Sequence, residues 1–126
     1  MGHLRIFMQD DTLTINKAKK AVAQFVAERD WQQFHTPKNL SMAIAIEASE
    51  IMEHFLWVDS EKSKTKLQEK RSDIEDEVAD VFIALLSFCN TCDIDLGDAF
   101  FAKLDSTKKK YPADKVKGRA IKYTDL

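Results

Sequence analysis

Two pairs of acidic residues have a spacing that could bind a metal ion. Glu47 and Glu50 are three positions apart, and Glu77 and Asp80 have the same spacing. Residues three apart lie on the same face of a helix, so each pair would present two carboxylates side by side. Glu47 also falls on an apolar stripe within residues 40–51, where a solvated carboxylate is not expected.

A divalent cation would resolve this conflict. Like charges on one helix face repel, and burying them unpaired would cost far more or force protonation. Mg²⁺ takes oxygen ligands and commonly joins carboxylates to substrate phosphates, so the four carboxylates predict a site for one or two Mg²⁺, with Mn²⁺ as the alternative ion. A di-iron bundle would use Glu-x-x-His pairs, and neither pair has histidine in that place.

The alternative interpretation is that both pairs are solvated. Acidic residues at this spacing are frequent on exposed helices, and 32% of this chain is charged. The protein would then be a non-catalytic helical module that binds nucleotides or other proteins. Spacing alone leaves both interpretations open, because short motifs have real false-positive rates.

The rest of the pattern predicts helices that would carry these pairs. The chain has three glycines and two prolines, and no strand-like alternation persists. Apolar residues at helical spacing predict four long helices, with a short helix or loop between the second and third. Thr36 with Pro37, and later Asp95, have the character of helix starts. The predicted fold class is all-α, a helical bundle of about four main helices, over residues 14–30, 36–57, 72–92 and 96–110.

Length and composition restrict the remaining possibilities. The 126 residues predict a single domain, 1–126, in which about 112–126 form an extended basic tail. A net charge of -2 gives no case for a nucleic acid partner. No run of apolar residues is long enough for a membrane span, and the start lacks a signal peptide's apolar core, so we expect a cytoplasmic protein. Cys89 and Cys92 lack companion metal ligands and are interpreted as small apolar residues.

Several segments together resemble a known family. The acidic pairs match the E-x-x-E…E-x-x-D signature of the MazG-like all-α nucleoside triphosphate pyrophosphohydrolases, in particular their dCTP pyrophosphatase branch. Three further segments are similar to elements of that branch: RDWQQFHTPKNL (29–40), KLDSTKKKYP (103–112) and KYTDL (122–126). The resemblance covers roughly residues 25–126.

The resemblance implies a reaction and an assembly. A nucleoside triphosphate, dCTP or a related deoxynucleotide, would be hydrolysed to the monophosphate and pyrophosphate by water attack at the α-phosphate. The catalytic and metal-binding residues would be Glu47, Glu50, Glu77 and Asp80. Phosphoryl transfer mainly requires positioning and charge neutralisation, which Mg²⁺ supplies. The family is dimeric or tetrameric, so we expect a homodimer or a dimer of dimers in which a neighbouring subunit completes the base pocket.

The same resemblance suggests which residues contact the substrate. Without it, the tryptophans would be interpreted as core, and periodicity alone would leave the lysine face open between a solvated surface and a phosphate site. Thr107 departs from the family, which usually has asparagine there, and Lys38 stands where the branch often has arginine. The implied base contacts are Trp31, His35 and Trp57, and the implied phosphate ligands on the fourth helix are Lys103 and Lys110. Lys38 and Tyr111 are further implied substrate contacts.

Overall fold

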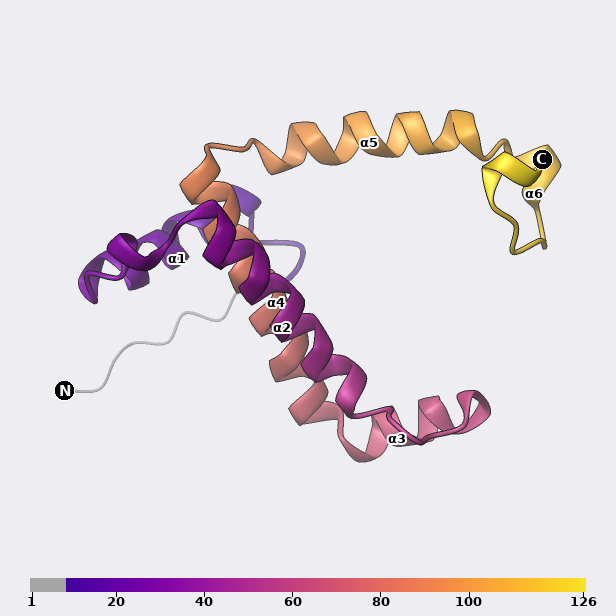
Figure 1. Cartoon of the computed structure of the whole chain (residues 1–126), viewed down its shortest axis with the longest axis horizontal. Coiled ribbons are helices and arrows are strands. Elements are labelled where there is room, and N and C mark those ends of the chain that lie inside the picture. Colours follow the sequence, from indigo (N-terminus) through magenta and orange to yellow (C-terminus); the bar gives the residue numbers. More distant parts are fainter. Residues whose placement is uncertain (1–8) are drawn as a thin grey trace. The chain divides into compact units, whose positions relative to one another are not determined.

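The computed structural model describes residues 9–126, and within them the chain forms helices and turns but no strand (Figure 1). The predicted all-α fold class is therefore confirmed. The α-helices are α1 (Ile15–Glu28), α2 (Pro37–Glu53), α3 (Ser63–Glu69), α4 (Arg71–Cys92), α5 (Leu96–Lys110) and α6 (Ala113–Val116). Three short 3-10 helices accompany them: η1 (Gln32–Phe34), η2 (Ser60–Lys62) and η3 (Tyr123–Asp125).

The four long helices lie close to their predicted ranges, with one difference that matters for the site. Helix α2 ends at Glu53, whereas the pattern predicted that it would continue to about Trp57. The polar stretch after it, which the sequence left open between helix and loop, contains η2 and α3. None of the helices in residues 9–126 combines the length and apolar character that a membrane span requires.

The chain divides into two compact units, Met1–Asp93 and Ile94–Leu126. The second unit holds α5, α6 and η3, so the segment expected to be an extended tail contains two short helical turns. That residues 1–126 form a single domain stays a prediction.

Helix starts follow the expected capping chemistry. The side chain of Thr14 accepts a hydrogen bond from the Lys17 backbone N–H, and Asp95 does the same for Asp98. Thr36 caps α2 in this way, with Pro37 at the first helical position, where its missing N–H costs nothing. These caps fix where α2 begins, and therefore which residues share its acidic face.

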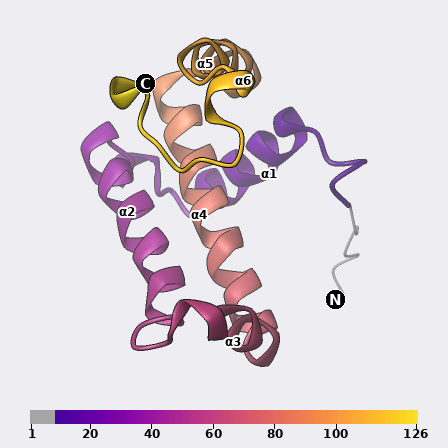
Figure 2. The same ribbon diagram turned by 90° about the vertical axis from the view of Figure 1, so that its right-hand side faces the viewer.

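The first unit is organised around the pairing of α2 with α4. These two helices lie side by side (Figures 1 and 2), and α1 packs on α4 as well. Because α3 joins the end of α2 to the start of α4, the two helices run in opposite directions (Figure 2). The carboxyl half of α2 is thereby brought beside the amino half of α4.

The core of this unit is small. Its buried apolar residues come from α1, α2 and α4, and Leu86 is the most deeply buried, with 1% of its surface exposed. The apolar spacing of this helix in the sequence predicts a core stripe through Val78, Phe82, Leu85 and Cys89; Cys89 is buried, but Val78 and Phe82 are 52% and 39% exposed. The reason is that neither α1 nor α2 fully covers that side of α4 in a single chain. Both cysteines are free thiols, and Cys89 is buried, as expected.

Truncating Leu86 tests this core. Leu86→Ala should lower the free energy of unfolding by about 2–5 kcal/mol, because a buried leucine leaves a cavity when it is cut back. Val78→Ala on the same helix is the matched control and should cost far less in a single chain. Urea unfolding followed by circular dichroism measures both. Equal losses would mean that Val78 is covered in solution, by a second copy for instance.

Candidate functional site

The antiparallel pairing of α2 and α4 brings the two acidic pairs together. One carboxylate oxygen from each of Glu47, Glu50, Glu77 and Asp80 lies within 4.8 Å of those of the others. Glu47, Glu50 and Glu77 are half-buried, while Asp80 is exposed. The sequence predicted that each pair would share a helix face; the structure adds that the two faces meet.

The proximity of these carboxylates changes their titration. Desolvation raises the pKa of Glu47 above its ordinary value of 4.5, and the neighbouring charges of Glu50 and Asp80 raise it further. A hydrogen bond with Glu50 is the main cause that raises the pKa of Glu77, followed by desolvation and by repulsion from Glu50, while His54 lowers it. Two carboxyl groups of this cluster therefore hold protons more tightly than isolated glutamates do.

His54 belongs to the surroundings of the cluster, although the sequence alone gave no reason to assign it a role. Its Nε2 atom lies 3.6 Å from Oε1 of Glu77, and both side chains are largely covered. The available signal was its spacing, four residues after Glu50 on one side of the helix. An imidazole here can orient Glu77 or share its charge when protonated.

The donor set suits a hard divalent cation. All four groups offer carboxylate oxygens, which Mg²⁺, Mn²⁺ and Ca²⁺ prefer, and the cluster contains no thiolate. Four negative charges this close need either protons or a cation to coexist. The residues present therefore fit a metal ion, and a cation bound between the helices would remove the repulsion that the pKa shifts report.

The aromatic residues expected around the base do not gather in one place within a chain. Trp31 and His35 precede the start of α2, whereas Trp57 follows its end. The helix between them has 17 residues and is about 25 Å long. One chain alone therefore cannot form a single wall from all three.

Trp57 lies beyond the carboxyl end of α2, which the sequence pattern had extended to about residue 57. Its backbone has φ 65°, the left-handed conformation that is unfavourable for a bulky side chain. The side chain is 94% exposed. With its side chain so exposed, Trp57 has little packing within one chain to offset the unfavourable backbone conformation. Its role in substrate binding stays a prediction.

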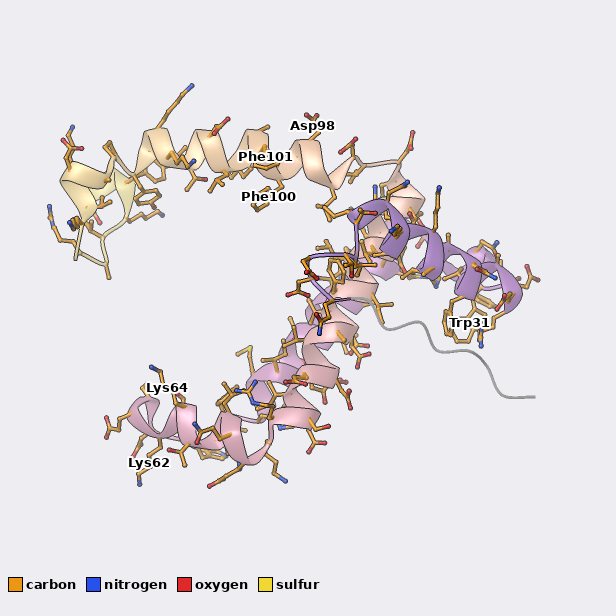
Figure 3. All side chains as sticks on the ribbon, turned by 180° about the vertical axis from the view of Figure 1, so that it is seen from behind. Trp31, Lys62, Lys64, Asp98, Phe100 and Phe101 are labelled. Atoms are coloured by element: carbon orange, nitrogen blue, oxygen red, sulfur yellow. The ribbon has the colours of Figure 1, made fainter. Side chains whose placement is uncertain are left out.

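Trp31 is held by neighbours at the end of α1 (Figure 3). Its ring meets Phe25 edge to face, with ring centroids 5.6 Å apart and an interplanar angle of 80°. The Arg29 guanidinium lies over the Phe25 ring, 3.9 Å from its centroid. Asp30, with φ 51°, makes the turn that places Trp31 beside α1. Contacts with Phe25, which itself packs against Arg29, therefore hold the Trp31 ring beside the end of α1.

Two cavities lie between α1 and α4. The polar cavity, of about 360 Å³, is lined by Ala23, Val26, Gln32, His35, Ser87, Asn90 and Thr91. The apolar cavity, of about 580 Å³, is lined by Leu13, Ala18, Ala21, Val22, Phe25, Asp80, Phe82, Ile83 and Leu86. His35 thus faces a polar space, while Asp80 borders an apolar one.

The basic residues expected to bind phosphate lie in the second unit. Thr107 donates its hydroxyl proton to the Lys103 carbonyl at 2.9 Å, so it is engaged with its own helix. The ammonium of Lys110 lies 4.9 Å from the centroid of the Tyr123 ring, which also meets Tyr111 edge to face. The roles of Lys103, Lys110 and Tyr111 stay predictions, as does that of the exposed Lys38 at the second position of α2.

Comparison with known proteins agrees with this geometry. Residues 42–126 match the MazG-like family, and the chain belongs to that family. The dCTP pyrophosphatase 1 of Rattus norvegicus is 39% identical over 115 residues, which cover 90% of this chain and 68% of the rat protein. The human protein of the same name is 36% identical over the same shares. The predicted resemblance to the dCTP pyrophosphatase branch is confirmed.

A solved structure supports the same assignment. The crystal structure of a pyrophosphatase from Archaeoglobus fulgidus is 31% identical and superposes with a TM-score of 0.76. The superposition covers 86% of this chain and 99% of that one.

The crowding of the acidic cluster predicts how stability depends on pH. Because the pKa values of Glu47 and Glu77 are raised by folding, their contribution to the stability of the metal-free protein should be most favourable where both are protonated. The protein should lose this stability as the pH rises from 4.5 through the folded-state pKa values. Glu47→Gln should remove part of this loss, so its melting temperature in EDTA at neutral pH should equal or exceed that of wild type.

Thermal melts in EDTA between pH 4.5 and 7.5 measure this, with the exposed Glu53→Gln at the end of α2 as the control. Divalent cation should raise the melting temperature of wild type more than that of Glu47→Gln. A large loss of metal-free stability in Glu47→Gln would show that this carboxylate holds the fold through protein contacts, which would contradict the metal interpretation.

Proposed function

We propose that this chain is a nucleoside triphosphate pyrophosphohydrolase, which converts a deoxynucleoside triphosphate, with dCTP or a close relative as the substrate, to the monophosphate and pyrophosphate. The observation that carries the proposal is the meeting of the four carboxylates within 4.8 Å of one another, from two antiparallel helices of a MazG-like chain. Solvated acidic pairs would have no reason to converge or to be half-buried.

The cofactor in this proposal is Mg²⁺, with Mn²⁺ able to replace it. When bound, the ion supplies positive charge against the phosphate oxygens and makes a water molecule more acidic. Glu47, Glu50, Glu77 and Asp80 would hold it, and the two helices fix their separation before the substrate arrives. A rigid, prearranged set of ligands costs little reorganisation during the reaction.

The chain's own residues would position and deprotonate the nucleophile. A carboxyl group whose pKa is raised accepts a proton from water more readily than an ordinary carboxylate does, because general bases work best with a pKa near the operating pH. Glu47 and Glu77 are the two carboxyl groups of the cluster whose pKa is raised above the ordinary value, so they are the candidates for this role. His54, beside Glu77, would hold that carboxylate in place and take up part of its charge.

The substrate contacts in this proposal come from several places. Trp31 and His35 would contact the base at one end of α2, and Lys38 would lie beside them. Lys103, Lys110 and Tyr111 would contact phosphates, and Trp57 would approach the base of a neighbouring subunit. Assembly as a homodimer or homotetramer is supported by the exposed apolar side chains of each chain, including Met52, Phe100 and Phe101 (Figure 3). We place the enzyme in the cytoplasm, with nucleotides and no nucleic acid as its ligands.

Hydrolysis in ¹⁸O-water tests the reaction and its regiochemistry. With dCTP and Mg²⁺, the label should appear in dCMP and pyrophosphate should leave unlabelled, because water attacks the α-phosphate. EDTA should abolish turnover, and so should Glu50→Gln and Asp80→Asn, whose circular dichroism should remain that of a folded chain. Glu53→Gln is the control that keeps activity. Label in orthophosphate, with dCDP as product, would contradict the proposal; binding without any turnover would favour the non-catalytic module.

Replacing the two tryptophans tests the base contacts. Stacking on an aromatic ring is worth about 1–3 kcal/mol per base, so Trp31→Ala and Trp57→Ala should each weaken apparent dCTP affinity by roughly 5–150-fold. Inhibition by free pyrophosphate should stay unchanged, because pyrophosphate has no base. Steady-state kinetics and pyrophosphate inhibition on the same variants measure this. If both constants weaken equally, the tryptophan supports the metal-bearing helices and does not contact the base.

A further inference from the structure

The polar cavity between α1, η1 and α4 contains a hydroxyl group without a partner. Ser87 is 6% exposed, and its side chain makes no hydrogen bond with the residues that the structure describes. Within those residues, every side-chain oxygen or nitrogen that is fully shielded from solvent has a hydrogen-bond partner. Since the Ser87 hydroxyl has no partner, it is not fully shielded, and we infer that it faces the cavity that Ser87 lines. A buried hydroxyl facing an open cavity is available to bind a ligand.

The lining of this cavity has donors and acceptors but no fixed charge. Gln32 and Asn90 offer amides, Ser87 and Thr91 offer hydroxyls, and His35 offers an imidazole. Without lysine, arginine or a carboxylate, the cavity is poorly suited to a phosphate. It suits a neutral, planar molecule with hydrogen-bonding edges, and about 360 Å³ is enough for a nucleobase.

The position of the cavity relates it to the acidic cluster. Glu77, Asp80, Ala84, Ser87 and Thr91 recur at helical spacing along one face of α4. Ser87 is two turns beyond Asp80, about 10 Å along the axis. The small side chain of Ala84 lies between them. The cluster and the cavity are therefore neighbouring places on one helix face, and a nucleotide with its α-phosphate at the cluster can place its base in the cavity.

Asn90 is held in one orientation. Its Nδ2 donates a hydrogen bond to the Lys19 carbonyl of α1, with a donor–acceptor distance of 3.0 Å. Rotating the amide by half a turn would set its oxygen against that carbonyl, so the positions of Oδ1 and Nδ2 are fixed. Asparagine in a fixed orientation accepts from an exocyclic amino group and donates to the adjacent ring nitrogen. A base with a keto group at that position would need the reverse arrangement.

We propose that the polar cavity binds the base of the substrate and that Asn90 selects a base with an exocyclic amino group, cytosine or adenine, over uracil or thymine. The inference rests on the proposed function for the position of the phosphates at the acidic cluster. Binding of the base in the cavity does not depend on that function. The apolar cavity is the competing place. Its lining has no hydrogen-bonding side chain except Asp80, which belongs to the acidic cluster and which the proposed function assigns to the metal ion, so no other side chain there can read the base.

Binding of a free nucleoside tests the location without requiring turnover. Deoxycytidine is titrated into the ¹⁵N-labelled full chain in EDTA, so neither metal nor phosphate contributes. Saturable shifts are expected at the backbone amides of Ser87 and Thr91 and at the side-chain amide of Asn90. Deoxyuridine should bind more weakly. Shifts centred on Val22 and Phe82, or no saturable shift at all, would overturn the assignment.

Kinetics test the selectivity. Asn90→Ala should reduce the ratio of kcat/KM for dCTP over dUTP by about 2–13-fold, the range for one lost hydrogen bond. Ser87→Ala should lower kcat/KM for dCTP, and pyrophosphate inhibition should be unchanged in both variants. Ser41→Ala, a matched change on α2 whose hydroxyl bonds the Lys38 carbonyl, should behave as wild type.

The two proposals fail in different ways. If deoxycytidine binds in the cavity but no triphosphate is cleaved, the proposed function is wrong and the base site stands. If dCTP is cleaved and a folded Asn90→Ala keeps the wild-type dCTP/dUTP ratio, the base site is wrong and the function stands. Because Asn90 also joins α4 to α1, circular dichroism checks that variant, whereas Ser87→Ala removes no hydrogen bond within the described chain.

Discussion

Repulsion among four carboxylates is the constraint around which the first unit is organised. Glu47 and Glu50 on α2 face Glu77 and Asp80 on α4 across a helix pair that supplies most of the packing of this unit. The apolar contacts that hold the helices together therefore also force the carboxylates together. The small core, with Leu86 at its centre, works against this repulsion whenever the charges are not neutralised. The packing of α2 on α4 thus holds the four carboxylates together in advance, so that a positively charged ligand finds them already arranged.

Much of the fold could be predicted from the sequence, because its signals are local. Helical spacing, the caps at Thr14 and Thr36, and the scarcity of glycine and proline are properties of neighbouring residues. The acidic pairs could be predicted for the same reason, since residues three apart must share a helix face. That the two pairs meet depends on the antiparallel pairing of α2 and α4, which spacing within either helix does not determine.

Other parts of the site depend on the chain's path in space and could not be predicted. The predicted range of α2 was too long at its carboxyl end, because the helix stops at Glu53 and nothing in the apolar pattern marks that end. The cavity that contains His35 is formed by α1, η1 and α4, three elements separated in sequence. The exposure of Val78 and Phe82 is a third case, because a pattern identifies an apolar face without showing which partner covers it. Each failure concerns a relation between elements, while the elements themselves were predicted well.

The face shared by Asp80, Ser87 and Thr91 limits how the chain can tolerate insertions and deletions. One residue gained or lost between Asp80 and Ser87 would rotate the rest of α4 by about 100° relative to the acidic cluster. Ser87 and Thr91 would then no longer share a helix face with the cluster. The connection between α2 and α4 beyond Trp57, residues 58–70, has no such geometric relation to the acidic cluster and can change length more freely. Changes at single positions along this face, such as Ala84 or Ser87, would alter the space available to a ligand while the carboxylates of the acidic cluster stay in register. The number of residues between Asp80 and Ser87 is therefore more strongly constrained than the identity of the side chains at positions such as Ala84 and Ser87.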